Sequence, residues 1–185
     1  MKNFIDITHK NLAVKLAETR EEIEKARVLR FDELINKSNP NIPYSQCFDD
    51  SDFIYDHLIV IDRDNGSVVG TYRLGRREQL EKIGDFYTNV KFNVDSLMAA
   101  EGEVLELSRM AIRESYRDGS VIKLLWKGLF AYCARFDVKW LFGIISLPTT
   151  EPDDALNFLS YINNGLLTEE FDLFAREPVV RTKLL

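Results

Sequence analysis

The predicted fold depends on one stretch of sequence, Leu105-Glu106-Leu107-Ser108-Arg109-Met110-Ala111-Ile112-Arg113, and on Tyr116-Arg117-Asp118-Gly119-Ser120 a few residues later. The first part predicts a β-strand, and the second predicts a glycine-containing loop that opens a long helix with an apolar face. Such a loop presents backbone N–H groups and a positive helix end to an anion such as a phosphate. Glutamate and arginine are rarely buried unless paired or functional, so Glu106 and Arg109 indicate either a working site or an ion pair between strands.

The composition narrows the class of protein. With 185 residues, 45% of them hydrophobic and 29% charged, the chain is predicted to form one soluble domain over residues 1–185. The net charge of -6 argues against a nucleic-acid partner, since binding to phosphate backbones needs clustered Lys and Arg. The only two cysteines, Cys47 and Cys133, are expected to be buried reduced thiols, which fits a cytoplasmic location. No run is as long as a membrane span, so membrane contact would be peripheral, at the inner face.

Periodicity predicts a strand and helix order of β-α-β-β-β-α-β-α-β, an α/β (α+β) arrangement. Thr19 and Glu22 form a capping box at the start of the first helix, and Asn65-Gly66 suits a tight hairpin turn. The segment 75–102 is predicted to be a long excursion with short helical pieces. The expected strands are 12–17, 57–63, 68–74, 104–112, 139–147 and 171–176, and the expected later helices are 120–136 and 152–162.

This order, with the loop-to-helix turn after the fourth strand, resembles the GCN5-related N-acetyltransferase (GNAT) fold. Leu105 to Arg109, the segment from Tyr116 to Leu129, and Leu141-Phe142-Gly143 with Ser146-Leu147-Pro148 together resemble the ornithine-acyl-ACP N-acyltransferases, often labelled hemolysin-like. The stretches 56–62 and 70–74 add to a match that covers nearly the whole chain. The resemblance implies a mixed central sheet flanked by helices, with a splay between its fourth and fifth strands.

The family is similar to the acyl-homoserine-lactone synthases, and this chain carries that wider family's charged residues. In those enzymes they form an electrostatic cluster beside the active site, so the resemblance implies the same role here. Four of them would bind substrate and two would serve catalysis. The positions are Arg30, Asp49, Asp52 and Arg73 for the first group, and Glu106 and Arg109 for the second.

Two departures from related sequences bear on the donor and on the extent of the chain. The loop Arg117-Asp118-Gly119-Ser120 lacks the second glycine that acetyl-CoA-using relatives carry. An acyl carrier protein (ACP) offers one phosphodiester on its pantetheine arm and needs fewer converging N–H donors than a pyrophosphate, so the degenerate loop suits acyl-ACP. No permanently bound cofactor is expected. Family members continue beyond the position of Leu185, so a C-terminal piece is expected to be missing.

Transfer to an amine needs a base, because an α-amino group with a pKa near ~8 is largely protonated at neutral pH. Glu106 is the candidate, acting through a water and held by Arg109. The alternative is a structural salt bridge. Positions 106 and 109 point to opposite faces of a regular strand, so a bulge is expected between them. Backbone N–H groups of Met110 and Ala111 are the expected oxyanion donors. No triad and no metal site is predicted. His9 and His57 lie in no catalytic pattern, and the acidic loop, which contains Asp49, Asp50 and Asp52, lacks the ligand spacing of a calcium loop.

Two surfaces are expected around this centre. An acyl chain is predicted to lie in an apolar slot between the fourth and fifth strands, walled by Leu107, Trp126, Leu141 and Ile144. A basic surface is predicted to receive the acidic carrier protein, and it comprises Arg76, Arg77, Arg113, Arg117, Lys123 and Lys127. Three alternatives stay open: another N-acyl amino acid synthase or homoserine-lactone-type enzyme, an acetyltransferase that uses coenzyme A, and a non-catalytic module that binds acyl groups or ACP.

Overall fold

The computed structural model describes residues 4–48, 50–147, 151–163 and 170–176. The chain divides into two compact units, Met1–Phe86 with Gly102–Phe142 and Tyr87–Glu101 with Gly143–Leu185. Each unit is described by itself, and the single domain over 1–185 stays a prediction.

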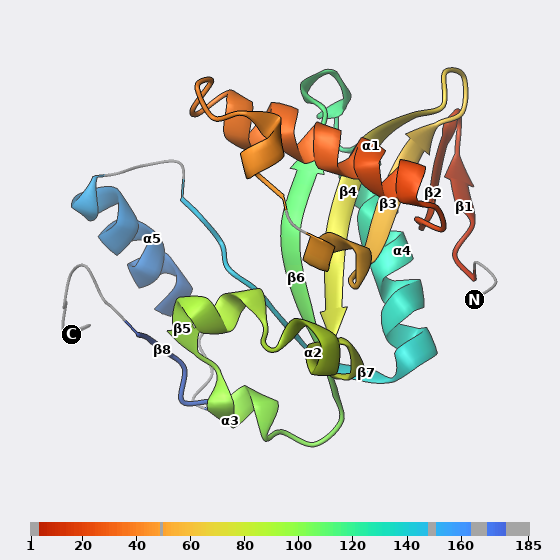
Figure 1. Ribbon diagram of the computed structural model, residues 1–185. Helices are drawn as coiled ribbons and strands as arrows, with labels where there is room; N and C mark the ends of the chain where they lie inside the picture. Colours follow the sequence, from red (N-terminus) through yellow and green to blue (C-terminus); the bar gives the residue numbers. More distant parts are fainter. Residues whose placement is uncertain (1–3, 49, 148–150, 164–169, 177–185) are drawn as a thin grey trace. The chain divides into compact units, whose positions relative to one another are not determined.

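The first unit is built on a six-stranded sheet with the order β1-β2-β3-β4-β6-β7 (Figure 1). All neighbouring strands are antiparallel except β6 and β7, which run parallel. The sheet is therefore mixed, as predicted, and its one unpredicted strand is β1 at the edge. The strands are β1 (Ile7–His9), β2 (Leu12–Leu16), β3 (Asp56–Asp62), β4 (Ser67–Arg76), β6 (Glu103–Ile112) and β7 (Val138–Phe142).

Two helices cover opposite faces of this sheet, with α1 (Arg20–Arg30) in front of it and α4 (Ser120–Phe136) behind it in Figure 1. Thr19 caps α1, because its Oγ1 accepts the N–H of Glu22 at 3.2 Å. The larger core lies under α4 and contains Leu58, Val60, Leu105, Leu125 and Leu129. A smaller cluster under α1 contains Ala26, Leu29, Ile59, Val68 and Ala111. Both helices were expected at these positions.

Short helical segments complete the first unit. A π-helix, Phe31–Asn36, continues directly from α1. Two 3-10 turns, Tyr44–Gln46 and Asp50–Phe53, lie between this π-helix and β3. Helix α2 (Arg77–Ile83) follows β4, and the 3-10 turn Glu114–Tyr116 follows β6. Strand β4 thus runs two residues further than expected, because Gly75 and Arg76 still pair with β6.

The ladder between β6 and β7 ends at the pair Glu106 and Phe142, whereas β6 continues to Ile112. The fifth predicted strand was expected to reach Leu147, and this was wrong: residues 143–147 are not in a strand. A bulge in β6 explains the difference, since a bulged strand bends and a straight partner does not stay paired along it. Strand β6 is paired with β7 only from Glu103 to Glu106, in agreement with the predicted splay.

The second unit contains a 3-10 turn (Tyr87–Val90), α3 (Asp95–Met98), α5 (Pro152–Asn163) and a two-stranded sheet of β5 (Phe92–Asn93) and β8 (Phe174–Ala175). Arg176 links its two ends, since Nε donates to the Asn89 carbonyl at 2.7 Å and a terminal nitrogen donates to Asn89 Oδ1 at 2.6 Å. The short helical pieces between 75 and 102 agree with the prediction. Pro148 was expected to end the strand 139–147, and Asn164-Gly165 was expected to end the helix 152–162. These three residues lie outside the described part of the chain.

Candidate active site

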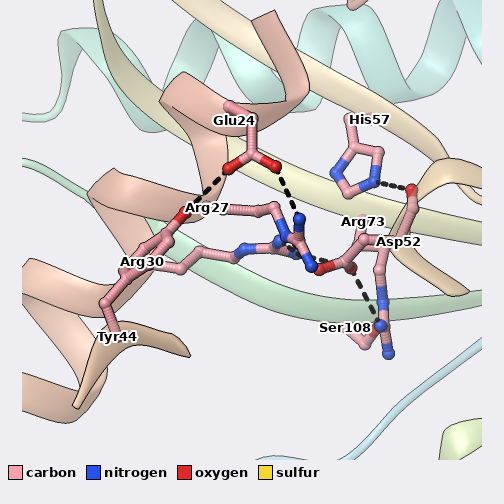
Figure 2. A network of polar contacts seen from close by, with 8 residues as sticks. All are labelled: Glu24, Arg27, Arg30, Tyr44, Asp52, His57, Arg73 and Ser108. Carbon is pink, nitrogen blue, oxygen red and sulfur yellow. Dashed lines mark hydrogen bonds and ion pairs between the residues drawn. The ribbon is translucent and has the colours of Figure 1, made fainter. Parts of the chain in front are cut away.

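A buried cluster of charged side chains lies between α1 and the sheet, with Asp52 at its centre (Figure 2). The Asp52 side chain is in contact with three arginines, two from α1 and one from β4. Arg30 donates to both carboxylate oxygens at 2.8 and 3.3 Å, Arg27 Nε donates at 3.2 Å, and a terminal nitrogen of Arg73 donates at 3.2 Å. Asp52 is 3% exposed and Arg30 is 1% exposed, so the ion pairs are shielded from solvent.

The arrangement keeps Asp52 ionised. Burial alone raises the pKa of its carboxyl, but the charges of Arg30 and Arg73 and the Arg30 hydrogen bonds lower it below the usual value. Burial lowers the pKa of Arg30, and the charges of Arg73 and Arg109 act in the same direction, while Asp52 opposes them. In these ion pairs three arginines meet two carboxylates, Asp52 and Glu24, so the cluster carries more positive than negative charge. An excess of positive charge suits a substrate carboxylate.

His57 belongs to the same cluster as a neutral side chain. It is 1% exposed, and its Nε2 lies 2.7 Å from the backbone oxygen of Asp52. Burial and the charge of Arg30 lower the pKa of His57 to about 4, so Nε2 carries the proton and donates it to that oxygen at neutral pH. The ring therefore fixes the acidic loop to β3.

Arg73 connects the cluster to β6. It lies opposite Ser108 in the β4–β6 ladder, and its Nε donates to Ser108 Oγ at 3.0 Å. The guanidinium also stacks on the Tyr55 ring, with 4.1 Å from Cζ to the ring centroid. One arginine thus contacts the acidic loop, an aromatic ring and the strand that carries Glu106.

Glu106 is fully buried and pairs with Gly75 across the ladder, on the same face as Arg73 and Ser108. A Cβ on Gly75 would lie 2.8 Å from the Tyr55 ring and 3.7 Å from the Glu106 Cβ, so glycine lets the ring pack against the strand beside the carboxylate. Glu106 and Ser108 therefore lie on one face of β6, beside Arg73, and Arg73 contacts Asp52 in the charged cluster. Its role as a base stays a prediction.

A β-bulge lies at Arg109. The ladder pairs Arg73 with Ser108 but Thr71 with Ala111, so Arg109 and Met110 together oppose Tyr72. Arg109 has φ +57°, a left-handed conformation that non-glycine residues seldom adopt and that the bulge imposes. The bulge expected between positions 106 and 109 thus begins at Arg109 itself. It interrupts the ladder at Arg109 and Met110, while Ala111 is paired again.

The predicted phosphate loop is occupied by its own aspartate. Asp118 Oδ1 accepts the Ser120 N–H at 2.9 Å and the Ser120 hydroxyl at 2.6 Å, so it takes the first N–H donor of α4. Gly119 has φ +91°, which explains the glycine. Arg117 turns away from the helix N-terminus and donates to Glu33 at 2.6 Å. A phosphate at this position would have to displace the Asp118 carboxylate, which the sequence did not foretell.

The four residues expected to wall the acyl slot come from both units, so only Leu107, Trp126 and Leu141 can be compared in position. Leu107 packs at the edge of the core under α4, and Leu141 on β7 is 42% exposed. Trp126 lies on the outer face of α4, where its ring is 5.8 Å from that of Phe130. Its helical position, away from the buried residues Val121, Leu125 and Leu129, excludes it from a slot between β6 and β7. Ile144 belongs to the second unit.

The expected carrier-docking residues also divide into two groups. Arg76 is 4% exposed and donates to Tyr132 Oη at 2.7 Å, so the prediction that it belongs to an open surface was wrong. Arg77 is partly exposed and donates to the Gly102 carbonyl at 2.6 Å. Arg113 and Arg117 pair with Asp32 and Glu33. Lys123 and Lys127 are exposed and line a cleft of about 450 Å³ with His9 and Trp126.

Several remaining predictions concern acidic residues, metals and membranes. Asp49 lies outside the described residues, and both carboxylate oxygens of Asp52 accept hydrogen bonds from arginines, so its role towards a substrate stays a prediction. Within the described part of the chain, no group of three or more His, Cys, Asp and Glu side chains is arranged to hold a metal. Helices long and apolar enough to cross a bilayer are absent from the same residues. Both cysteines are free thiols but only half-buried.

Arg27, Tyr55, Gly75, His57 and Ser108 are site residues that the sequence did not single out for a role. Arg27 had a signal, because it lies three residues before Arg30 on the same side of the helix. Gly75 and Tyr55 are far apart in sequence, and only the ladder register brings them together.

Residues 27–127, more than half of the chain, match the model of the acetyltransferase (GNAT) domain, and the chain therefore belongs to this family. Among solved structures, an aminoglycoside N-acetyltransferase AAC(6')-Iy in complex with CoA has a TM-score of 0.51 at 14% identity over 97% of this chain and 100% of that one. FeeM, an N-acyl amino acid synthase from uncultured soil microbes, has a TM-score of 0.52 at 10% identity over 80% and 75%. These two support the fold.

The chain is similar to curated L-ornithine N(alpha)-acyltransferases. It is 33% identical to that of Brucella abortus (strain 2308) over 178 residues, 89% of this chain and 63% of the relative. It is 28% identical to that of Rhizobium meliloti (strain 1021) over 185 residues, 93% of this chain and 62% of the relative. The chain thus spans less than two thirds of the length of these relatives.

Proposed function

We propose that this chain is the catalytic part of an N-acyltransferase that moves a long-chain, in some cases 3-hydroxylated, fatty acyl group from acyl carrier protein to the α-amine of ornithine or a similar amino acid, as in the synthesis of lyso-ornithine lipid. The main supporting observation is the buried Glu106 on β6, which lies on the same sheet face as Ser108 and Arg73, while Arg73 contacts Asp52 in the charged cluster. The similarity to L-ornithine N(alpha)-acyltransferases supports the same reaction.

The proposed chemistry follows from the charges. The surplus of Arg30 and Arg73 over Asp52 attracts the acceptor's α-carboxylate, and Arg109 adds to it. Glu106 takes a proton from the α-ammonium through a water, which leaves an amine able to attack the thioester carbonyl. The bulge at Arg109 and Met110 interrupts the ladder, and backbone N–H groups at Met110 and Ala111 stabilise the oxyanion. The intermediate then collapses, the C–S bond breaks, and the sulfur takes up the proton that the attacking nitrogen gives up, so it leaves as the thiol of the pantetheine arm, which stays attached to the carrier.

The donor is the finer part of the proposal. Asp118 fills the first donor position of α4, which disfavours the pyrophosphate of coenzyme A more than the single phosphodiester of a carrier arm. The end of the β6–β7 ladder at Glu106 supplies a place where the arm can run along the strand. The product would be an amphiphile, so release at the inner face of the cytoplasmic membrane by peripheral contact fits the reaction.

Mass spectrometry of products tests the proposal directly. The 185-residue chain is incubated with palmitoyl-ACP, palmitoyl-CoA or acetyl-CoA, each with ornithine, lysine or glycine. We expect N-acyl ornithine from palmitoyl-ACP, and slower transfer from acetyl-CoA because each buried methylene contributes about 0.8 kcal/mol. Acetyl transfer from coenzyme A at the highest rate would instead support an acetyltransferase. Binding of acyl-ACP with no transfer to any acceptor would support the non-catalytic module.

A further inference from the structure

A second cleft of about 450 Å³ lies at the outer end of the charged cluster. It is within the range of roughly 300–1,000 Å³ that is usual for small-molecule sites. We call it the acidic cleft, and its lining comes from α1 and the loop before β3: Glu24, Arg27, Tyr44, Ser45, Phe48 and Asp50. All of these residues belong to the first unit.

Two aromatic rings form the apolar part of the acidic cleft. The Tyr44 and Phe48 rings are 5.2 Å apart, and Tyr44 also packs edge-on against Phe31 at 5.3 Å. The guanidiniums of Arg27 and Arg30 lie 5.0 and 5.2 Å from the Phe48 ring centroid, so the ring lies beside the arginines of the charged cluster. A short methylene chain would find apolar contact on these rings.

Glu24 supplies a carboxylate that stays ionised. Its two oxygens accept hydrogen bonds from Arg27 at 2.6 Å and from Tyr44 Oη at 2.8 Å. Burial raises the pKa of Glu24, but these hydrogen bonds outweigh it and lower the pKa below the usual value. Each carboxylate oxygen has a second lone pair, so Glu24 retains capacity for a further donor. Figure 2 shows Glu24 between Arg27 and Tyr44.

Asp50 is the second carboxylate of the acidic cleft, and its situation differs from that of Asp52 two residues later. Asp52 is 3% exposed and bound by three arginines, whereas Asp50 is exposed and forms no ion pair with any described residue. The sequence alone grouped these aspartates as one acidic loop. The structure makes Asp52 a part of the scaffold and leaves Asp50 open to a ligand.

We propose that the acidic cleft receives the side-chain ammonium of a diamino acid acceptor, between Glu24 and Asp50, with the methylenes against Tyr44 and Phe48. This inference rests on the proposed function and adds the feature that selects the acceptor. The acidic cleft contains the carboxylates of Glu24 and Asp50, and the charged cluster beside it contains the guanidiniums of Arg30 and Arg73. An amino acid with a terminal ammonium matches this order when its α-carboxylate points towards the arginines and its side chain points into the cleft.

Ornithine and norvaline make the sharpest comparison, because they share a five-carbon backbone and differ only in the terminal amine. We expect Asp50→Asn and Glu24→Gln each to lower the ratio of kcat/KM for ornithine to that for norvaline by at least about tenfold, the effect of losing one hydrogen bond between charged groups. The change should appear in KM and leave the kcat for ornithine much less affected. Glu21→Gln is the matched control, since Glu21 lies on the same helix, is 77% exposed and pairs with Lys25 outside the cleft.

Equilibrium binding gives a readout that does not depend on turnover. By calorimetry, the wild-type chain should bind ornithine more tightly than norvaline, and the two variants should lose this difference while circular dichroism shows an intact fold. Equal binding of ornithine and norvaline by the wild type overturns the inference, as does an unchanged ratio in both variants. Selective binding of ornithine without acyl transfer would leave the acidic cleft in place and reject the proposed function.

Discussion

Arg73 on β4 lies directly opposite Ser108 on β6, and its Nε donates to Ser108 Oγ at 3.0 Å. A terminal nitrogen of the same guanidinium donates to Asp52 at 3.2 Å. The acidic loop, the helix arginines and the strand that carries Glu106 are thereby held as one network. A substitution in this network is expected to affect either chemistry or stability, and the two effects can be separated residue by residue.

Glu106→Gln should abolish most of the turnover and leave the fold intact, because glutamine keeps the size of the buried side chain but cannot take a proton. We expect kcat to fall by roughly 10²-fold or more, the usual contribution of a positioned base. Product formation by mass spectrometry and thermal unfolding measure the two effects. Glu114→Gln, an exposed position just after β6, is the control. Near-normal turnover in Glu106→Gln would make Glu106 a structural residue.

Asp52→Asn should destabilise the fold strongly, since it removes the charge of Asp52 from its ion pairs with three buried arginines. Removing one partner of a buried ion pair typically costs about 3–5 kcal/mol. Urea unfolding at pH 7 measures this loss. Asp137→Asn, whose side chain is 84% exposed, should change the free energy of unfolding by less than about 0.5 kcal/mol. Equal stability of both variants would show that the arginines do not depend on Asp52.

His57 predicts a specific pH dependence of stability. Its folded-state pKa of about 4 lies below the ordinary value of 6.5, so the unfolded chain binds the proton more tightly. Stability is therefore complete above pH 6.5 and is lost as the pH falls from 6.5 towards 4, by roughly 2–3 kcal/mol at pH 4.5.

His57→Gln isolates this effect, because the amide keeps a donor for the Asp52 carbonyl and does not titrate. Urea unfolding at pH 7 and at pH 4.5 should show a smaller difference in the variant than in the wild type. The lowered pKa of Asp52 acts only at lower pH, where its contribution is lost as the carboxyl is protonated. A variant with the wild-type slope between pH 6.5 and 4.5 would contradict the assignment to His57.

The proposed carrier partner predicts a charge effect on the outer face of α4. Lys123→Glu with Lys127→Glu should raise the KM for acyl-ACP at low salt, because ACP is acidic and these lysines are exposed. The difference from wild type should shrink as salt screens charges beyond about 8–10 Å. Lys25→Glu on α1 is the control for net charge. If the double variant and the Lys25→Glu control have the same KM for acyl-ACP at every salt concentration, ACP docks elsewhere.

Much of the fold could be predicted because the local patterns are strong. The cap at Thr19, the Asn65-Gly66 turn and the apolar face from Val121 to Tyr132 each act over a few residues. The strand predicted to reach Leu147 failed because hydrophobicity does not report whether a partner strand is available.

The candidate site was predictable only in part, for a related reason. Arg30, Asp52, Arg73 and Glu106 followed from a resemblance to known enzymes, and the structure brings the first three into contact. The roles of Arg76 and Asp118 could not be foreseen, since an arginine's burial or an aspartate's choice of hydrogen-bond partner depends on tertiary packing. Trp126 lies away from the buried residues Val121, Leu125 and Leu129 of α4, so the spacing of the apolar residues already places it outside the core.

The bulge at Arg109 has a consequence for how β6 can change in evolution or design. Ser108 and Ala111 are three positions apart, yet the extra residue lets both side chains lie on the face under α1. Deletion of one residue here would turn every later side chain of the strand to the other face, while Glu106 and Ser108 kept theirs. The side chains before the bulge and those after it therefore take their faces independently of each other. The one extra residue in the bulge is what places Ser108 and Ala111 on the same face of the sheet.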